Sequence, residues 1–142
     1  MASHATGDGS IPPRDATERG LKRIMTVGGA YGTRNYTVKD LRDQKGKKVL
    51  VETATFSPEE AAAAEQAGID TIKVRFDPAH PELVAAMRKA APNTFMAFSV
   101  PLVAAASEVE AVRLGYDAMA LGADAIMCQW SPRFVSAATE GG

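Results

Sequence analysis

The stretch KVLVETATFSPEEAAAAEQAGIDTIKVRF, residues 48–76, decides the fold class because it contains one complete strand–helix–strand unit. Residues 48–55 are rich in β-branched side chains and predict a strand. Ser57 predicts the start of a helix, with a capping hydroxyl before a first-turn proline, and Gly68 predicts its end. Residues 71–76 predict a second strand, and the short connections indicate that the two strands run parallel.

The alternation of strand and helix continues on both sides of this unit. Thr37 with Asp40 predicts a capping box upstream, and Ser107 with Glu110 predicts another downstream. The further expected elements are a short helix over 37–45, a helix over 81–90, a strand over 94–100, a helix over 107–121, a strand over 124–129 and a last helix from Ser131.

Two segments of the chain resemble each other, GIDTIK at 68–73 and GADAIM at 122–127. Both place a helix-ending glycine, one small or apolar residue and an aspartate before a strand. Such a turn is a common way to lead a helix back into a parallel strand. The repeat therefore strengthens the prediction of the fold and carries no information on function.

Four successive strand–helix units are about half of a parallel (β/α)8 barrel of the TIM type, which takes roughly 250 residues. The 142 residues therefore predict an α/β fold, with a half barrel over 37–142 and a partly disordered leader over 1–36. The structure of residues 21–35 stays open, and the glycines in 28–32 fit a flexible turn better than a phosphate-binding loop. Since four units do not close a barrel, we expect further strands from residues after Gly142 or from a second copy.

The composition argues against several classes of protein. A net charge of −1, with 46% hydrophobic and 23% charged residues, provides no basic surface for a nucleic acid. No apolar run approaches the roughly 20 residues that cross a bilayer, and the first residues lack the apolar core of a signal peptide. The single cysteine, Cys128, excludes an internal disulfide. We therefore expect a cytoplasmic protein with no membrane and no nucleic-acid partner.

Reactive groups in parallel α/β folds gather at the C-terminal ends of the strands. Alternation places Thr53 and Thr55 on one face of the sheet, and Lys73 on the same face as Arg75, without indicating which face points inward. The candidate substrate-binding residues are Thr53, Thr55, Arg75, Ser99 and Gln129, the candidate metal ligand is Asp77, and Trp130 lies at the same end of its strand.

These candidates have plain structural alternatives. Asp77 can hold a divalent cation through its oxygens or, in an Asp-Pro turn, cap the next helix. Ser99 can contact a ligand or bond only to the backbone, and Trp130 can cover a pocket or pack on the last helix. Cys128 lies in an expected buried strand with no base nearby, which favours packing in the core over a role as nucleophile.

The remaining polar groups predict little chemistry. His4 lies in the leader and His80 at an expected helix start, so no histidine pair has metal-ligand spacing and no Ser/His/Asp set is evident. This disfavours hydrolase and zinc chemistry. Lys45, Lys47 and Lys48 adjoin a strand start and predict a solvated surface at the N-terminal end of the sheet.

Several scaffold features of the chain occur together in one known family. They are Gly46-Lys47-Lys48 before the first strand, Thr53-Ala54 at its end, Glu65-Gln66-Ala67-Gly68-Ile69 before the second strand, Ala91-Pro92 before the third, Pro101 after it, and Leu121-Gly122-Ala123-Asp124-Ala125 before the fourth. In these features residues 37–142 resemble the first half of the ketopantoate hydroxymethyltransferase family, within the phosphoenolpyruvate mutase and isocitrate lyase superfamily of barrels.

The resemblance implies a Mg²⁺-dependent aldol transfer of a one-carbon unit from methylenetetrahydrofolate to a small branched 2-oxo acid, as in pantothenate biosynthesis. The metal of that family holds the oxygens of an enolate. Ser99 stands where the family has an aspartate, and Met127 and Gln129 stand where it has a lysine and a glutamate. Asp77 keeps a carboxylate after the second strand with a shift of one residue. Because neutral oxygens bind Mg²⁺ poorly, the sequence predicts a weakened metal site.

Two hypotheses of function follow from the sequence. The first is a divergent or truncated enzyme of this family that acts on a small 2-oxo acid by carbon–carbon bond chemistry. The second is a non-catalytic half barrel that binds or assembles by pairing with itself or with another chain. The scaffold features favour the first hypothesis, and the reduced set of acids favours the second.

Overall fold

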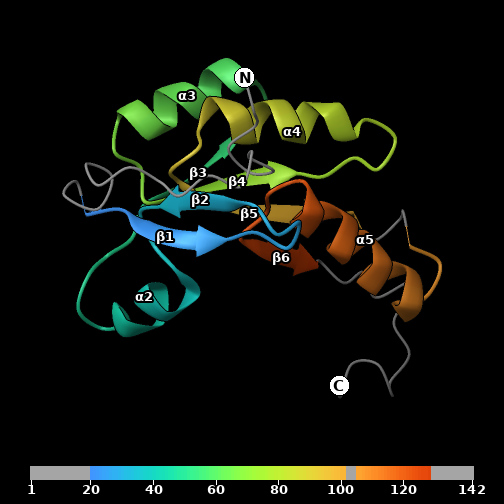
Figure 1. The fold of residues 1–142 in the computed structure, drawn as a ribbon, viewed down its shortest axis with the longest axis horizontal. Helices are drawn as coiled ribbons and strands as arrows, with labels where there is room; N and C mark the ends of the chain where they lie inside the picture. The colour runs from blue at the N-terminus through green and yellow to red at the C-terminus, as the bar shows by residue number, and fades with distance from the viewer. Residues whose placement is uncertain (1–19, 102–104, 129–142) are drawn as a thin grey trace.

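The computed structural model describes residues 20–101 and 105–128 (Figure 1). Within these ranges strands and helices alternate, which confirms the expected α/β fold. Gln129, Trp130 and the expected helix from Ser131 lie outside the described residues, and so do residues 1–19 of the expected leader.

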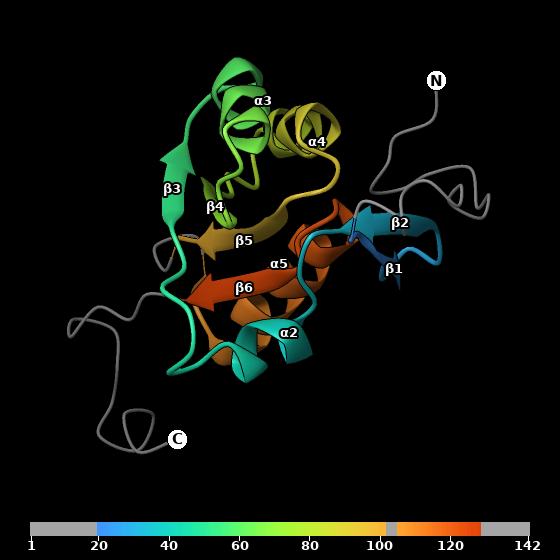
Figure 2. The same cartoon turned by 90° about the vertical axis from the view of Figure 1, so that its left-hand side faces the viewer.

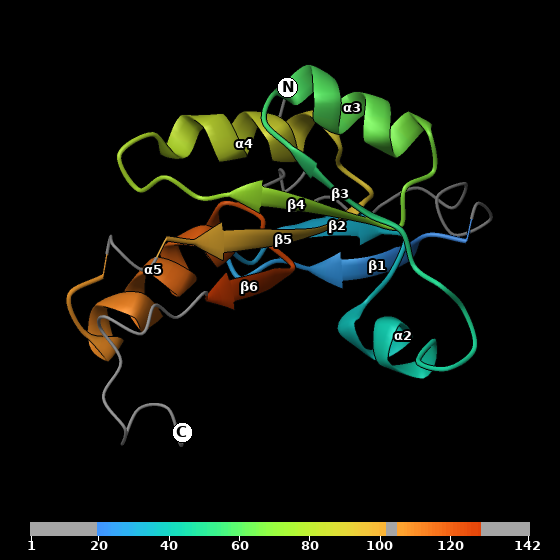
Figure 3. The ribbon, with the colours of Figure 1, turned by 180° about the vertical axis from the view of Figure 1, so that it is seen from behind.

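A four-stranded parallel sheet forms the centre of the structure, and all its strands run in one direction (Figure 3). Its spatial order is the order along the chain: β3 (Glu52–Thr55), β4 (Thr71–Arg75), β5 (Phe95–Val100) and β6 (Ala125–Cys128). The connecting helices are α3 (Pro58–Gln66), α4 (Pro81–Ala90) and α5 (Glu108–Ala120). Among the described strands the sheet is open, with β3 and β6 at its edges, so closure into a barrel stays a prediction.

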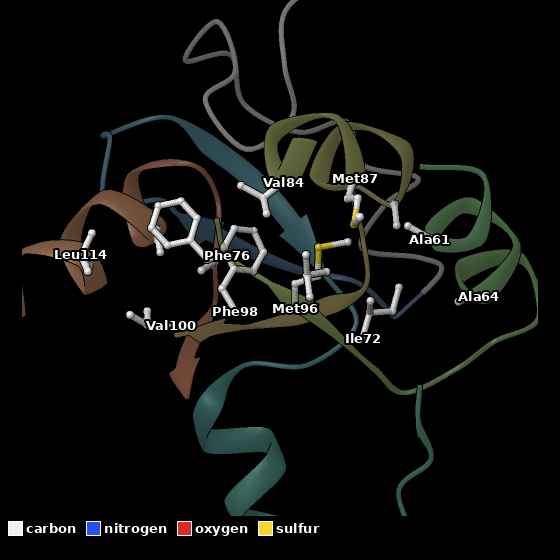
Figure 4. Close-up of a cluster of buried hydrophobic side chains, with 14 residues drawn as sticks. Ala61, Ala64, Ile72, Phe76, Val84, Met87, Met96, Phe98, Val100 and Leu114 are labelled. Carbon is white, nitrogen blue, oxygen red and sulfur yellow. The ribbon is translucent and has the colours of Figure 1, made fainter. Parts of the chain in front are cut away.

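Helices α3, α4 and α5 cover one face of the sheet and enclose the core with it (Figure 4). Side chains of β4 and β5 point into this layer, among them Phe98 of β5. Phe76, the residue after β4, points the same way. They meet Val84 and Met87 of α4 and Leu114 of α5, all nearly inaccessible to solvent. Three helices on one sheet face are the outer layer of an α/β unit, and the opposite face of the sheet is called the inner face below.

Local capping starts each of the helices that the sequence predicted to be capped by a hydroxyl residue. The Thr37 hydroxyl accepts from the Asp40 N–H at 3.2 Å, while the Thr37 N–H donates to the Asp40 carboxylate at 2.8 Å. The Ser57 and Ser107 hydroxyls each accept an N–H bond from the third residue after them. The predicted capping box is therefore confirmed at Thr37 and Asp40. At Ser107 only the hydroxyl half is confirmed, because the Glu110 carboxylate accepts from the Ala106 N–H at 2.6 Å and not from the Ser107 N–H.

The N-terminal segment forms an antiparallel hairpin of β1 (Lys22–Met25) and β2 (Tyr31–Arg34). In its turn, the Thr26 N–H donates to the Ala30 carbonyl at 2.8 Å and Gly29 has φ of +84°, in the left-handed region that favours glycine. The interpretation as a turn is confirmed for Gly28 and Gly29, whereas Gly32 lies in β2 and pairs with Ile24. Through Arg34 the hairpin is hydrogen-bonded to the sheet unit, so the expected boundary at residue 36 runs through a single packed unit.

Helix α2 (Val38–Asp43) lies on the opposite side of the sheet from α3 and α4 (Figure 2). Its Val38 and Leu41 line an apolar pocket of about 500 Å³ together with Phe95 and Ala125, which begin β5 and β6. The helix therefore covers part of the N-terminal end of the inner face. The rest of that face, toward the C-terminal ends of the strands, lies away from α2.

The two aspartates of the internal repeat fasten neighbouring strands at this N-terminal end. The Asp70 N–H donates to the Val51 carbonyl at 3.1 Å, and its carboxylate accepts from the Val51 N–H at 2.9 Å. Asp124 makes the same pair of bonds with Met96, both at 2.9 Å. Each aspartate thus fixes the register of one strand against its neighbour, which is the structural role of the repeat.

Two arginines are buried beside the second aspartate. Arg34 donates through Nε to both carboxylate oxygens of Asp124 at 2.8 Å, and Arg88 of α4 donates through Nη1 at 3.1 Å. Arg88 also donates to the carbonyls of Ala91 and Thr94. Burial and then repulsion by Arg34 lower the pKa of Arg88, because one carboxylate faces two guanidinium groups. Such a network holds the N-terminal end of the sheet together.

Candidate functional site

The strand register separates the sequence-predicted site residues into two groups. Arg75 pairs with Ser99, and Ser99 pairs with Met127, so these three side chains share one face. Neighbouring residues in a parallel register point the same way, and alternation adds Lys73 to this group. This face is opposite the helix layer, so Lys73, Arg75 and Ser99 lie on the inner face near the C-terminal ends of β4 and β5.

Thr53 and Thr55 belong to the other face. They pair with Ile72 and Val74, whose side chains lie in the core under the helices. Thr55 is only 3% exposed, and its hydroxyl contacts the sulfur of Met87 at 3.8 Å. The structure therefore does not bring the two threonines together with Arg75 and Ser99, although all four lie at strand ends.

The inner face carries two cations that form no ion pair within the described part of the chain. Arg75 is exposed and Lys73 is partly buried. Neither forms an ion pair or a side-chain hydrogen bond with residues of the described ranges, unlike Arg34, Lys39, Lys48 and Arg88, which each face a carboxylate. Two unneutralised cations beside the Ser99 hydroxyl form a surface suited to a small anion.

Beyond β4 the chain forms a tight turn that joins Asp77 to His80. The Asp77 carboxylate accepts from the Ala79 N–H through Oδ1 at 2.9 Å, and its Oδ2 lies 2.9 Å from His80 Nδ1. The His80 N–H also donates to the Asp77 carbonyl at 3.0 Å. Asp77 thus forms an Asp-Pro turn at the helix start, with its carboxylate bound to an imidazole.

The pair shifts the titration of both groups. The hydrogen bond from His80, followed by that from the Ala79 N–H, lowers the pKa of Asp77. The hydrogen bond to Asp77, followed by its charge, raises the pKa of His80. The ion pair is therefore lost as the pH falls through the lowered Asp77 pKa, and again as the pH rises through the raised His80 pKa. Both side chains are well exposed, at 49% and 65%, so solvent screens their attraction.

The described residues do not fit the Mg²⁺ ion that the family resemblance implies. Within the described ranges there is no group of three or more histidine, cysteine, aspartate or glutamate side chains that could hold a metal. Both oxygens of Asp77 already have partners, and Lys73 and Arg75 precede it on the same strand. A hard divalent cation needs several free oxygens and little nearby positive charge.

Cys128 does not pack in the core, and the expectation that it does is wrong. It is the last residue of β6 and is exposed. The sequence pattern indicates a buried strand, but β6 is an edge strand of the described sheet, so only one of its sides is covered by a neighbouring strand. At the opposite end of the sheet, Lys45 and Lys47 are solvated as expected, while Lys48 bonds to Tyr36 and Asp70.

Two cavities lie at the N-terminal end of the sheet, away from this inner-face group. One is the apolar pocket under α2, and the other, of about 160 Å³, lies between the hairpin and residues such as Phe95, Met119 and Asp124. Both are lined mainly by apolar side chains. In parallel α/β units this end serves stability, whereas the C-terminal ends of the strands carry the chemistry.

Sequence reasoning missed His80 as a functional candidate. The signal was present in Asp77-Pro78-Ala79-His80, because an aspartate three residues before a histidine in a turn can meet its ring. The expectation for His80 concerned only a second histidine at metal-ligand spacing, which the sequence does not contain. The C-terminal ends of β4 and β5 thus carry Lys73, Arg75 and Ser99 on one face, and the Asp77–His80 pair lies in the turn that follows β4.

No helix in the described ranges is long and apolar enough to cross a membrane. Comparisons of the chain with protein-family models, with curated proteins and with solved structures found no match.

Proposed function

We propose that the C-terminal edge of β4 and β5 binds a small 2-oxo acid and takes part in carbon–carbon bond chemistry on it. The observation that carries this proposal is the pair of cations Lys73 and Arg75 on the inner face, neither of which forms an ion pair in the described part of the chain. A carboxylate is the natural counterion for such a pair, and the planar guanidinium matches it in a bidentate manner. The ketopantoate hydroxymethyltransferase-like features of the scaffold support the choice of a 2-oxo acid.

Each side chain has a distinct part in this binding. Arg75, the more exposed cation, takes the substrate carboxylate at the rim of the sheet. Ser99 is its register partner on β5 and donates its hydroxyl to the 2-oxo oxygen. Lys73, two residues deeper on β4, adds positive charge where an enolate oxygen would develop. Donors that are fixed by a sheet need little reorganisation when that charge forms.

The binding proposal can be tested by calorimetry of the 142-residue chain with 2-oxoisovalerate. We expect heat of binding for the chain and a loss of affinity of about tenfold or more for Arg75→Met, the equivalent of at least about 1.4 kcal/mol. Arg113→Met is a matched control, because it removes the same charge from an exposed position on α5. Absence of heat with the unmodified chain, or equal affinity losses in both variants, would contradict the proposal.

A second candidate function is assembly, which the open edges of the sheet favour. Strand β6 contributes Ala125 to Cys128 without a charge or a proline, the residues that usually protect an edge. On the other edge, Val49 and Val51 before β3 and Phe56 after it are exposed. Two copies related by a twofold axis along the strands would place β6 of each beside β3 of the other and give eight parallel strands.

Light scattering tests the assembly candidate. Pairing predicts a mass of twice the 15.0 kDa of one chain at micromolar concentration, reduced toward the single-chain value in Val51→Lys. Val109→Lys serves as the control, since this valine is 79% exposed and lies in the first turn of α5, in the helix layer and not on a strand. A single-chain mass for the unmodified protein across the concentration range would exclude self-pairing.

A further inference from the structure

We propose that His80 is the group that moves the proton in this chemistry, as a general acid–base residue whose ring is held by Asp77. The inference rests on the proposed function, because it names the proton-transfer group at the same edge of the sheet. It arises from a contact that the family resemblance does not contain, the 2.9 Å approach of His80 Nδ1 to Asp77 Oδ2.

The geometry of the pair fixes which nitrogen is available. With Nδ1–H donating to the Asp77 carboxylate, the neutral ring carries its lone pair on Nε2. Asp77 is itself held by the Ala79 N–H and by the turn closed from the His80 N–H. A carboxylate that is fixed by the backbone and orients an imidazole is the arrangement that general-base histidines use. His80 makes no capping bond at the start of α4 that would explain its placement otherwise.

Through Asp77 the pair is connected to the end of the strand that carries the proposed anion site. The ladder between β4 and β5 continues one residue past β4, because the Phe76 N–H donates to the Ser99 carbonyl at 2.9 Å. Phe76 faces the core, and Asp77 is the next residue, two positions after Arg75, where the turn begins. The charge of Arg75 contributes to the lowered pKa of Asp77, which places the two groups within electrostatic reach. Figure 3 shows the loop after β4 extending beyond the arrowheads of the sheet.

The proposed step is the enolisation of the bound 2-oxo acid. His80 Nε2 takes the proton from C3, the carbon–hydrogen bond breaks, and its electron pair forms the C2–C3 double bond. The carbonyl π pair moves onto the C2 oxygen, where Ser99 and Lys73 stabilise the negative charge while Arg75 holds the carboxylate. The reverse step returns the proton from the imidazolium to C3. No oxidant or reductant is required, and the step creates the nucleophilic carbon that bond formation needs.

The charged groups around His80 set the pH at which it acts. Asp77 raises its pKa most, and Glu82 in the first turn of α4 raises it further, while Arg75 acts on Asp77. The base is the deprotonated ring, so activity rises with pH through the His80 pKa and then levels off. Removing the Asp77 charge lowers that pKa and moves the rise to lower pH.

The experiment is proton NMR of 2-oxoisovalerate in D₂O with the full chain, following the exchange of its C3 proton for deuterium. We expect exchange above the protein-free rate, and a loss of at least about 100-fold in His80→Gln. Asp77→Asn should show slower exchange, and its exchange rate should increase with pH at a lower pH than in the unmodified chain. Glu82→Gln is the control that removes a nearby charge without touching the pair, and it should keep most of the activity.

Calorimetry on the same variants separates the two proposals. Binding of 2-oxoisovalerate without exchange, or exchange that His80→Gln leaves unchanged, would overturn the role of His80 and leave the binding proposal standing. Absence of binding by the unmodified chain would overturn both. Urea unfolding of His80→Gln checks that this variant is folded. If it is unfolded, the Asp77→Asn variant tests the role of His80 through the pH at which deuterium exchange rises. A purely structural role of the turn would leave that pH unchanged.

Discussion

Replacing Asp124 with alanine is expected to lower the free energy of unfolding by about 3–5 kcal/mol. The substitution leaves two arginines, Arg34 and Arg88, buried at 1% and 0% exposure with no carboxylate bonded to either. It also removes the acceptor for the Met96 N–H in the sheet. Breaking one partner of a buried ion pair is costly because the remaining charge stays desolvated.

Urea denaturation followed by circular dichroism measures this effect. Asp70→Ala is the matched control, because Asp70 occupies the same place in the repeat and bonds the neighbouring strand in the same way. Its cationic partner Lys48 is 47% exposed and regains water when the carboxylate is removed. We therefore expect a smaller loss for Asp70→Ala, and equal losses would show that the buried arginines do not depend on Asp124.

Replacing Phe98 with alanine is expected to cost about 3–5 kcal/mol of unfolding free energy. Phe98 is 0% exposed at the centre of β5, the strand between β4 and β6. Its ring lies in the cluster that joins the sheet to the helix layer (Figure 4). Removal of the ring loses the transfer free energy of its carbons and leaves a cavity that the surrounding strands cannot close.

The same urea measurement with Tyr116→Ala provides the comparison. Tyr116 is an aromatic residue on α5 with 66% of its surface exposed, so its truncation should change the unfolding free energy by no more than about 0.5 kcal/mol. Similar losses in the two variants would mean that the core described around Phe98 does not carry the stability of the fold.

The fold was predictable from sequence where the signals are local. Ser57 and Ser107 begin their helices as expected, because the hydroxyl and the N–H that it caps are three residues apart. The start of the first strand was placed at residue 48, whereas β3 begins at Glu52. The valines before β3 have high strand propensity, but Val49 is 86% exposed. Propensity does not indicate where an edge strand begins to pair with its neighbour.

Groups whose partners are distant in sequence were not predictable. Arg88 lies in the last turn of α4, where an arginine usually reaches solvent, yet it is buried because Asp124 lies beside it across 36 residues. The hairpin strands are too short and irregular to show a period, and their position depends on the same aspartate. Tertiary contacts of this kind override local preference.

For the candidate site, the sequence predicted the strand ends and could not choose the face. Alternation paired Thr53 with Thr55 and Lys73 with Arg75, and only the helix layer determines that the threonines point into the core. The Asp77–His80 contact depends on the path of one turn, which the Asp-Pro sequence indicates but does not place relative to Arg75.

Asp70 and Asp124 hold neighbouring strands together at the N-terminal end of the sheet only. The free energy of local opening should therefore decrease along the strands toward their C-terminal ends. Hydrogen exchange should be slowest for the amides of Val51 and Met96, whose N–H groups are held by carboxylates, and faster toward the rim at Ser99. The strands would then separate first at their C-terminal ends, while the N-terminal ends stay held by the aspartates. A small anion bound across β4 and β5 would hold these strand ends together. Its binding would slow hydrogen exchange at the C-terminal ends of the strands without a change in the fold.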